Sequence, residues 1–299
     1  MLEVKNVSKI IEGKTIIDNI SFCLPSREIL GIVGPDGAGK STLTRIIAGL
    51  LRPTTGEVFF EGNNLSLSSS HSFVKDTVAY MPQQFALYED LTVEENLHFM
   101  GRLHGLPKKE RENKIEKLYQ FSNLKPFRKR LAGHLSGGMK QKLGLMCVLM
   151  HNPKLLILDE PTNGVDPVSR REFWEVLYEL LKEDTTIVLT TSYLDEAERC
   201  SQVAVMYEGR FLFMKPSEEI SSLLSHEVIE IEVENPFATF SMLQKIAPLS
   251  IFVRGNSLLL FSENPDKELP FIFSAIGKKI PWKRKKPSLE DVFIAWLTR

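Results

Sequence analysis

A glycine-rich octapeptide offers the clearest chemistry in this sequence. Residues 34–41 read Gly-Pro-Asp-Gly-Ala-Gly-Lys-Ser, between a short apolar run, 30–33, and a helix-like run, 42–50. Glycines let backbone N–H groups converge on an anion, and the N-terminus of the following helix adds its positive end. Lys40 can reach the outer phosphates of a nucleotide, and the Ser41 hydroxyl can ligate Mg²⁺. The predicted phosphate cradle comprises Gly34, Pro35, Asp36, Gly37, Ala38, Gly39, Lys40, Ser41 and Thr42.

A pair of carboxylates follows a second apolar run. Residues 155–158 are all leucine or isoleucine, as in a central strand of a parallel sheet, and Asp159 and Glu160 come directly after them. Open α/β sheets bind ligands at the carboxyl ends of their strands. Asp159 is suited to hold Mg²⁺, and Glu160 to polarise an attacking water as a general base. An Asp-Glu pair alone is common in loops, so this prediction depends on the phosphate cradle.

A third polar segment, residues 135–141, reads Leu-Ser-Gly-Gly-Met-Lys-Gln. Ser136 can cap the helix that follows, and the bare backbone N–H groups of Gly137 and Gly138 can point outward at an anion. With the cradle and the acidic strand, this segment resembles the signature of ABC transporter ATPases. The resemblance covers most of residues 2–215. It implies a Mg²⁺-dependent ATPase of the P-loop class.

The resemblance also assigns roles to residues outside the cradle. It implies a head-to-tail dimer, in which Ser136, Gly137 and Gly138 complete the ATP site of the opposite chain. Gln83, in the run Tyr-Met-Pro-Gln, is similar to the glutamine near Mg²⁺ and the attacking water. The implied metal ligands are thus Ser41, Gln83 and Asp159.

Two further segments face partner chains in this family. Asp166, in Asn-Gly-Val-Asp, is similar to the anchor of a loop that crosses the dimer. Residues 88–97 resemble the region that docks on a transmembrane permease. The resemblance therefore implies two kinds of partner, a second ATPase chain and one or more permease subunits.

Three positions depart from the family pattern. Ser192, in Thr-Thr-Ser-Tyr-Leu-Asp-Glu-Ala-Glu, stands where the family places a switch histidine. Serine carries no positive charge toward the γ-phosphate, and losing one preorganised donor costs a factor of about 100–1,000 in rate. Ile11 falls where an aromatic side chain stacks on adenine, so it would keep only apolar contact with the base. Asp36 replaces a commoner asparagine, and we expect its carboxylate to face away from the phosphates.

The elements that must position these residues belong to two domains. Residues 1–222 predict an α/β nucleotide-binding domain, with an antiparallel subdomain that turns at residues 12–14 and a helical insert over about 85–150. We expect residues 58–62 to form an edge strand and the serine-rich residues 66–72 to form a loop.

Residues 223–299 predict a small α+β domain. Its expected elements are a strand at 226–234, a helix at 240–247, a hairpin at 250–261, and helices at 269–276 and 289–297. The basic run 283–286 beside Trp282 could contact anionic lipid headgroups. The favoured interpretation is a solvated strand end.

Composition excludes several classes of protein. The 299 residues carry 37 basic and 38 acidic side chains, so no nucleic-acid partner is expected. Three scattered cysteines, Cys23, Cys147 and Cys200, indicate a reduced chain without a disulfide framework. The longest apolar run, 143–150, is far shorter than the about 20 residues that a membrane-spanning helix needs. We therefore expect a peripheral protein at the cytoplasmic face of a membrane, linked to that membrane through another chain.

The preferred function is the subunit that energises a membrane exporter through ATP-driven dimer closure. The runs 85–96 and 287–293 resemble the drug and polysaccharide export branch, and residues 34–40 and 191–198 resemble the N-terminal halves of tandem-ATPase exporters. Because Ser192 weakens this chain's own site, a hetero-pair with a second ATPase is favoured over a homodimer. The alternative is a soluble ABC-type ATPase not coupled to transport. A small-molecule kinase with the same cradle would have no use for the signature.

Overall fold

The computed structural model describes residues 1–66, 70–84, 87–224, 226–246, 250–277 and 279–297. Contacts between backbone segments divide the chain into two compact units, Met1–Lys215 and Pro216–Arg299. The domain boundary expected from the sequence follows residue 222, and that functional boundary stays a prediction. The short 3₁₀ helix η4, Ser217–Leu223, packs on the last helix of the second unit and so belongs with it.

A mixed sheet forms the centre of the first unit. In the described part of that unit it has six strands, in the order β10-β9-β3-β8-β7-β6. Strands β6, β7, β8, β3 and β9 pair in parallel, so their carboxyl ends meet at one edge. Their bounds are β3 Ile29–Val33, β6 Val78–Met81, β7 Leu155–Asp159, β8 Thr186–Thr191, β9 Gln202–Tyr207 and β10 Arg210–Pro216.

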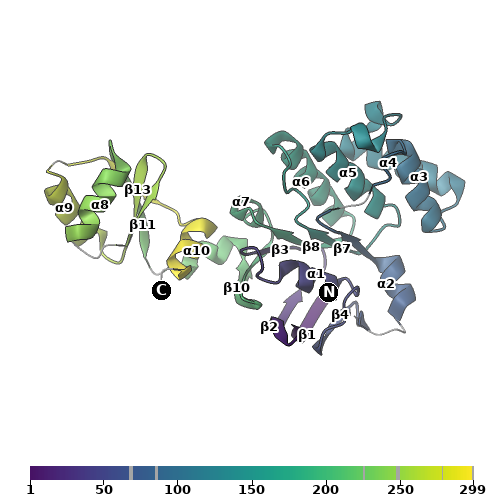
Figure 1. The fold of residues 1–299 in the computed structure, drawn as a ribbon, viewed down its shortest axis with the longest axis horizontal. Helices are drawn as coiled ribbons and strands as arrows, with labels where there is room; N and C mark the ends of the chain where they lie inside the picture. Colours follow the sequence, from purple (N-terminus) through teal and green to yellow (C-terminus); the bar gives the residue numbers. More distant parts are fainter. Residues whose placement is uncertain (67–69, 85–86, 225, 247–249, 278, 298–299) are drawn as a thin grey trace. The chain divides into compact units, whose positions relative to one another are not determined.

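The central strand β7 supplies two hydrophobic cores at once. Leu155 and Ile157 pack into the core beneath the sheet, whereas Leu156 and Leu158 pack into the core above it. Successive strand residues point to opposite faces, so a continuous apolar run is what a strand covered on both sides requires. Figure 1 shows the sheet between a helical layer and the N-terminal strands. The predicted α/β class is confirmed.

An antiparallel sheet, ordered β2-β1-β4-β5, lies below the central one. Strands β1, Leu2–Ile11, and β2, Lys14–Leu24, join through the expected turn, where Glu12 and Gly13 both have positive φ. Strand β4, Thr55–Phe60, is an interior strand, because the two-residue β5, Asn63–Asn64, pairs with its outer side. The prediction of an edge strand there was wrong, since nothing in the run itself signals the short β5.

A helix also occupies part of the expected serine-rich loop. Helix α2, His71–Thr77, begins inside that segment, and residues 67–69 lie outside the described residues. Phe73 and Val74 pack against the lower core. Tertiary packing therefore overrides the weak helix propensity of serine that the sequence argument relied on.

The helical layer gathers on the other face of the central sheet (Figure 1). Its opening helix α3 is held by a capping box between Thr92 and Glu95. The elements are α3 Val93–Leu103, α4 Lys108–Ser122, η2 Lys125–Phe127, η3 Ala132–His134, α5 Gly137–Val148 and α6 Pro167–Lys182. On the lower side, α1, Lys40–Ile47, fills the space between the two sheets. The short α7, Leu194–Ala197, follows β8.

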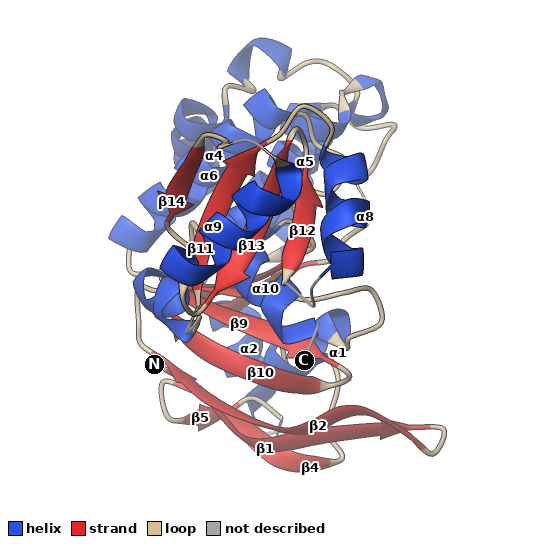
Figure 2. Cartoon of the chain, turned by 90° about the vertical axis from the view of Figure 1, so that its left-hand side faces the viewer, coloured by secondary structure: helices blue, strands red, loops and turns tan. Residues whose placement is uncertain are grey.

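The second unit has the βαββαβ order of a split-βαβ fold. Among its described residues, four antiparallel strands lie in the order β12-β13-β11-β14. Figure 2 shows α8 and α9 over one face of this sheet, where they cover Ile229, Ile231, Leu258 and Leu260. Its elements are β11 Glu227–Glu232, α8 Pro236–Ile246, β12 Ile251–Arg254, β13 Ser257–Ser262, α9 Pro265–Ile276, β14 Trp282–Lys285 and α10 Leu289–Leu297.

The basic run lies on the exposed edge strand β14. Lys283 pairs with Glu230 at 3.1 Å, and Arg284 pairs with Glu227 at 2.9 Å, both across to β11. Lys285 reaches the buried Asp291 of α10 at 3.1 Å. These pairs favour the interpretation as a solvated strand end over contact with lipid. In the part of the chain that the structure describes, no helix combines the length and apolarity needed to cross a bilayer.

Candidate functional site

The phosphate cradle joins β3 to α1 at the carboxyl edge of the central sheet. Gly39, the N-cap of α1, has φ +103°, and a Cβ there would lie 2.8 Å from the Ile16 carbonyl oxygen. Both facts require glycine. The Lys40 ammonium is buried, and it donates to the carbonyl oxygens of Gly34 and Pro35 at 2.7 and 3.2 Å. The loop therefore holds one cation beside backbone N–H groups, which suits a polyphosphate.

Asp159 ends β7 next to this cradle. Its Oδ1 accepts hydrogen bonds from the Ser41 hydroxyl at 3.0 Å and the Thr190 hydroxyl at 2.7 Å, and its Oδ2 accepts from the Tyr80 hydroxyl at 3.2 Å. Burial, together with the negative charge of Asp159, raises the pKa of Tyr80, so Tyr80 stays a donor. Mg²⁺ prefers oxygen ligands, such as carboxylates, phosphates and water, so the Asp159 carboxylate beside the Ser41 hydroxyl fits this ion.

Glu160 is the point where four segments meet. Its carboxylate lies 3.4 Å from the Lys40 ammonium and accepts from Gln83 Nε2 at 3.4 Å, Asn163 Nδ2 at 3.2 Å and the Ser192 hydroxyl at 3.1 Å. The residue is buried and has φ +47°, which lies in the left-handed region. Such strain is retained where surrounding structure holds a functional side chain in place.

A cavity of about 460 Å³ opens in front of the cradle. Its lining consists of Ile16, Asp36, Gly37, Gly39, Lys40, Ser41, Thr42, Gln83 and Glu160. Ile16 was not predicted from the sequence as a residue of this site. The alternation along β2 indicates it, because Ile17 is buried and its neighbour faces the other side of the strand.

Two predicted nucleotide contacts have exposed side chains, and only one of them, Asp36, lines the cavity. Ile11 ends β1, is 42% exposed and does not line the cavity, so its contact with a base stays a prediction. The Asp36 carboxylate is exposed, with one oxygen 4.0 Å from the Lys40 ammonium.

The signature segment starts α5 beside the start of α6. Ser136 caps α5, and its hydroxyl oxygen accepts from the Met139 N–H at 3.4 Å. Asp166 caps α6 by accepting from the N–H groups of Val168 and Ser169 at 3.1 and 2.9 Å, which lowers the Asp166 pKa. None of the residues from 136 to 138, nor Asp166, lines the cradle cavity. These residues therefore form a second surface, made of two neighbouring helix N-termini.

The close approach of these two helices depends on one glycine. A Cβ on Gly138 would lie 2.5 Å from the Ser169 Cβ, whereas a Cβ on Gly137 would meet only the Gly164 carbonyl oxygen, at 4.0 Å. Gly138 therefore has a packing role and Gly137 has open space. The glycine pair in the sequence did not distinguish these two roles.

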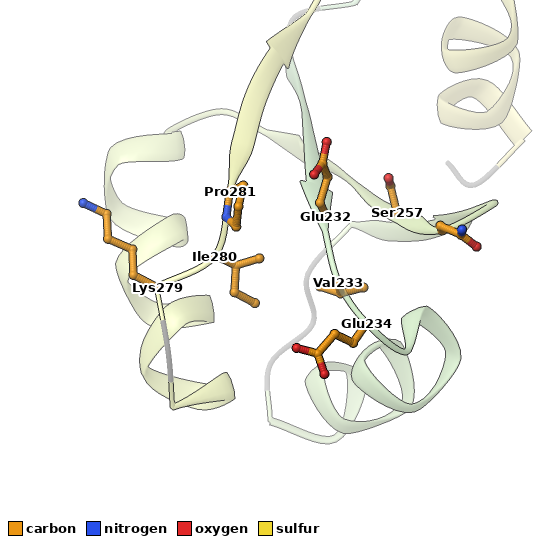
Figure 3. A pocket seen from close by; sticks show the side chains of 8 residues that line it. Glu232, Val233, Glu234, Ser257, Lys279, Ile280 and Pro281 are labelled. Atoms are coloured by element: carbon orange, nitrogen blue, oxygen red, sulfur yellow. The ribbon is translucent and has the colours of Figure 1, made fainter.

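The second unit has a cavity of its own, of about 540 Å³ (Figure 3). Val233 and Ile280 contribute apolar surface to it, and Glu232, Glu234 and Lys279 contribute charges. Figure 3 shows the Lys279 side chain pointing away from the other labelled groups. Because these charges do not converge on one point, the cavity is a weaker candidate than the cradle.

Comparisons with known proteins agree with this geometry. The family profile of ABC transporter matches residues 17–163. The probable multidrug ABC transporter ATP-binding protein YbhF of Escherichia coli strain K12 is 50% identical over 185 residues, which are 62% of this chain. That stretch spans only 32% of the length of YbhF. The Nod factor export ATP-binding protein I of Sinorhizobium fredii is 35% identical over 295 residues, covering 98% of this chain and 84% of that protein.

Solved structures agree as well. An ATP-binding subunit of an ABC transporter superimposes with a TM-score of 0.67 at 30% identity, covering 74% of this chain and 92% of that one. The cassette MJ0796, in a dimeric post-hydrolysis state bound to ADP and Pi, superimposes with a TM-score of 0.66 at 25% identity, covering 73% and 99%. The chain therefore belongs to the ABC transporter ATP-binding proteins, a family of ATPases.

Proposed function

We propose that this chain binds and hydrolyses ATP to energise an ABC exporter, as a peripheral subunit at the cytoplasmic face of a membrane. The observation that carries the proposal is the meeting of Lys40, Ser41, Gln83 and Glu160 around one cavity, with Asp159 hydrogen-bonded to Ser41. Phosphoryl transfer to water needs a cation that binds phosphate, ligands for Mg²⁺ and a general base, and these residues supply all three.

The nucleotide is held by its phosphates. Lys40 exchanges its contacts with the Gly34 and Pro35 carbonyls for the β- and γ-phosphates, while the N-terminus of α1 faces the same charge. Ser41, Asp159 and Gln83 would hold Mg²⁺ through their oxygen atoms, and the bound ion would neutralise charge on the phosphates.

Hydrolysis depends on Glu160. Its carboxylate accepts a proton from the attacking water, and Gln83 and Asn163 hold that carboxylate by hydrogen bonds at 3.4 and 3.2 Å. The Ser192 hydroxyl donates to the same group at 3.1 Å. A neutral hydroxyl in this place orients Glu160 but brings no positive charge to the γ-phosphate, so this site turns over slowly.

The second surface serves another chain. The helix N-termini capped by Ser136 and Asp166 offer backbone N–H groups to the ATP and the loop of an opposing cassette. Since the signature is intact while the chain's own site carries Ser192, we favour a hetero-pair with a second, faster ATPase. ATP binding then closes the pair, and hydrolysis opens it.

Coupling to export is supported by the names of relatives, which describe multidrug and Nod factor export. Tyr88 is 52% exposed and contacts Phe99 edge to face, with ring centroids 4.7 Å apart, on the surface proposed to dock a permease. Phe85, the first residue of the exporter-like run, lies outside the described residues.

The test is a pair of measurements on the purified chain. MgATP binding and single-turnover phosphate release are compared between wild type and Glu160→Gln, with Lys40→Ala as the binding-deficient control. We expect Glu160→Gln to bind ATP normally and to lower the release rate by about 100-fold or more. Equal release rates in the two proteins would disprove the assignment of Glu160.

Coupling to transport needs a separate test. Affinity purification of the chain from detergent-treated membranes should recover a multi-helix membrane protein and a second cassette. If the chain is recovered alone and no fraction of it sediments with membranes, the alternative of a soluble ATPase is the better account.

A further inference from the structure

Glu196, in the short helix α7, is a carboxylate with no exposed surface that no step of the proposed mechanism uses. A charge removed from water is costly unless other groups hydrogen-bond to it or carry the opposite charge. A buried polar cluster is often no more stable than an apolar cluster of similar volume, so the contacts of this carboxylate point to a role beyond packing.

Three partners from three different segments hold the Glu196 carboxylate. The Thr162 hydroxyl donates to Oε1 at 2.6 Å, and the Thr191 hydroxyl donates to Oε2 at 2.8 Å. The Arg170 guanidinium of α6 lies 3.4 Å from Oε1 and supplies the opposite charge. Glu196 therefore ties the loop after β7 to the end of β8 and to α6.

Arg170 extends the same network toward the partner-facing surface. It donates to the Val165 carbonyl oxygen at 3.4 Å, next to the α6 cap Asp166. Its guanidinium also lies 4.0 Å from the centre of the Tyr193 ring. The Thr191 hydroxyl oxygen in turn accepts from the Tyr193 N–H at 3.0 Å, which closes a turn around Ser192.

These anchors flank the two groups whose contact matters most in the site. Thr191 directly precedes Ser192, and Thr162 follows Glu160 by two residues. Ser192 and Glu160 meet at 3.1 Å. Glu196 does not line the cradle cavity, so it can affect the chemistry only through the residues that it holds.

We propose that Glu196 is a positioning residue that holds the Ser192 turn and the 162–166 loop in one arrangement, and thereby sets the contact between Ser192 and Glu160. This role rests on the proposed function, because it concerns the same ATP site. Both the charge and the length of the Glu196 side chain are needed, because two hydroxyls and one guanidinium from separate segments must reach its carboxylate together.

The first test compares Glu196→Gln with a matched control, Asp291→Asn. Glutamine keeps the size of the side chain, but it loses the charge facing Arg170 and turns an amide donor toward one threonine. Asp291 is also a carboxylate with no exposed surface, held by Ser288 and Lys285 in the other unit. Both variants lose a buried charge, and only Glu196→Gln loses one beside the site.

Single-turnover kinetics with MgATP separate positioning from stability. We expect Glu196→Gln to lower the hydrolysis rate constant by about 10- to 100-fold while the ATP concentration at half-maximal rate changes less than about twofold. Asp291→Asn should leave both constants at the wild-type values. The proposal is overturned if Glu196→Gln has the wild-type rate constant, or if its rate and its ATP affinity fall together in step with loss of folded protein.

A double-mutant cycle with Ser192→His tests the route of the effect. If Glu196 acts through the Ser192 turn, the gain in rate from Ser192→His should shrink to less than about twofold when Glu196→Gln is also present. Equal gains in the two backgrounds would show that Glu196 does not act through this turn.

Hydrogen exchange distinguishes this proposal from failure of the proposed function. Glu196→Gln should speed amide exchange in residues 160–166 and 190–193, and Asp291→Asn should not. If neither wild type nor Ser192→His releases phosphate, the proposed hydrolysis is wrong. Unchanged exchange in those two segments would then refute the role of Glu196 on its own.

Discussion

At the scale of single residues, the chemistry of this site depends on what surrounds Glu160. Lys40 brings a positive charge to within 3.4 Å of its carboxylate, and Ser192 offers a hydroxyl at 3.1 Å. A histidine in place of Ser192 would have two ring nitrogens and a longer side chain. Under the proposed mechanism, the identity of this one side chain decides whether a second charged donor, besides Lys40, faces the γ-phosphate.

We predict that Ser192→His raises the ATP hydrolysis rate of the purified chain by about tenfold or more, because it restores a charged donor toward the γ-phosphate. Steady-state phosphate release measures the change. The control is Ser192→Ala, which removes the donor to Glu160 and should not accelerate the reaction. Brisk hydrolysis by the wild type, unaltered by Ser192→His, would contradict the slow-site proposal.

At the scale of elements, the contact between α5 and α6 sets the shape of the surface proposed to face a second chain. The two helix N-termini lie side by side only because Gly138 leaves room for Ser169. Lys142 of α5 and Glu172 of α6 pair at 2.5 Å farther along the same contact. The shape of the surface around the signature segment, residues 135–141, therefore depends on how these two helices pack.

Gly138→Ala should destabilise the first unit by about 1–3 kcal/mol, since its Cβ would overlap the Ser169 side chain. Thermal unfolding measures the loss. Gly137→Ala, only one residue away, has open space for its Cβ and serves as the control. Adding Ser169→Gly to Gly138→Ala should recover most of the loss, and the packing argument fails if it recovers none.

A histidine pair links the helical layer to the edge strand β6. The rings of His104 and His151 stack at 4.1 Å, and one nitrogen of His151 lies 3.3 Å from the Val78 carbonyl oxygen. Burial, and secondarily the neighbouring His104, lowers the pKa of His151 from 6.5 to about 4. The folded chain therefore prefers His151 neutral.

This shift predicts a pH dependence of stability with a definite sign. The unfolded chain binds a proton near pH 6.5 and the folded chain only near pH 4, so this contribution is complete above pH 6.5 and is lost as the pH falls toward 4. His151→Gln should flatten the fall in melting temperature over that window. His71→Gln, at an exposed position of α2, is the control, and the melting temperature of this variant should fall with pH as steeply as that of the wild type.

At the scale of the whole molecule, the two units have separate cores. The second unit buries Ile229, Ile231, Leu258 and Leu260 beneath α8 and α9, and its α10 is anchored by Asp291 to Lys285 of β14. The first unit contains every residue proposed to bind nucleotide.

Residues 216–299 expressed alone should therefore fold and unfold in one cooperative transition, because their core and their ion pairs lie within the fragment. Circular dichroism during heating measures this. Residues 1–215 alone should bind MgATP with an affinity within about threefold of the full chain. A fragment 216–299 that melts without a cooperative transition would show that its core depends on the first unit.

The local motifs of this chain could be read from sequence because their chemistry lies in consecutive residues. A glycine turn before a helix and an acidic pair after a buried strand are short local patterns, whereas Ser192 stands out only against the resemblance to the family. The α/β class also followed from local patterns, since β7 is apolar at every position before Asp159.

Only the tertiary structure decided the rest, because those features depend on residues far apart in the chain. Strand β5 makes β4 an interior strand, and packing of Phe73 and Val74 turns a serine-rich loop into a helix. Tyr80 reaches Asp159, and Thr162, Arg170 and Thr191 converge on Glu196, through contacts that no spacing along the sequence predicts. Motifs determine which chemistry is available, and packing determines which side chains hold it in place.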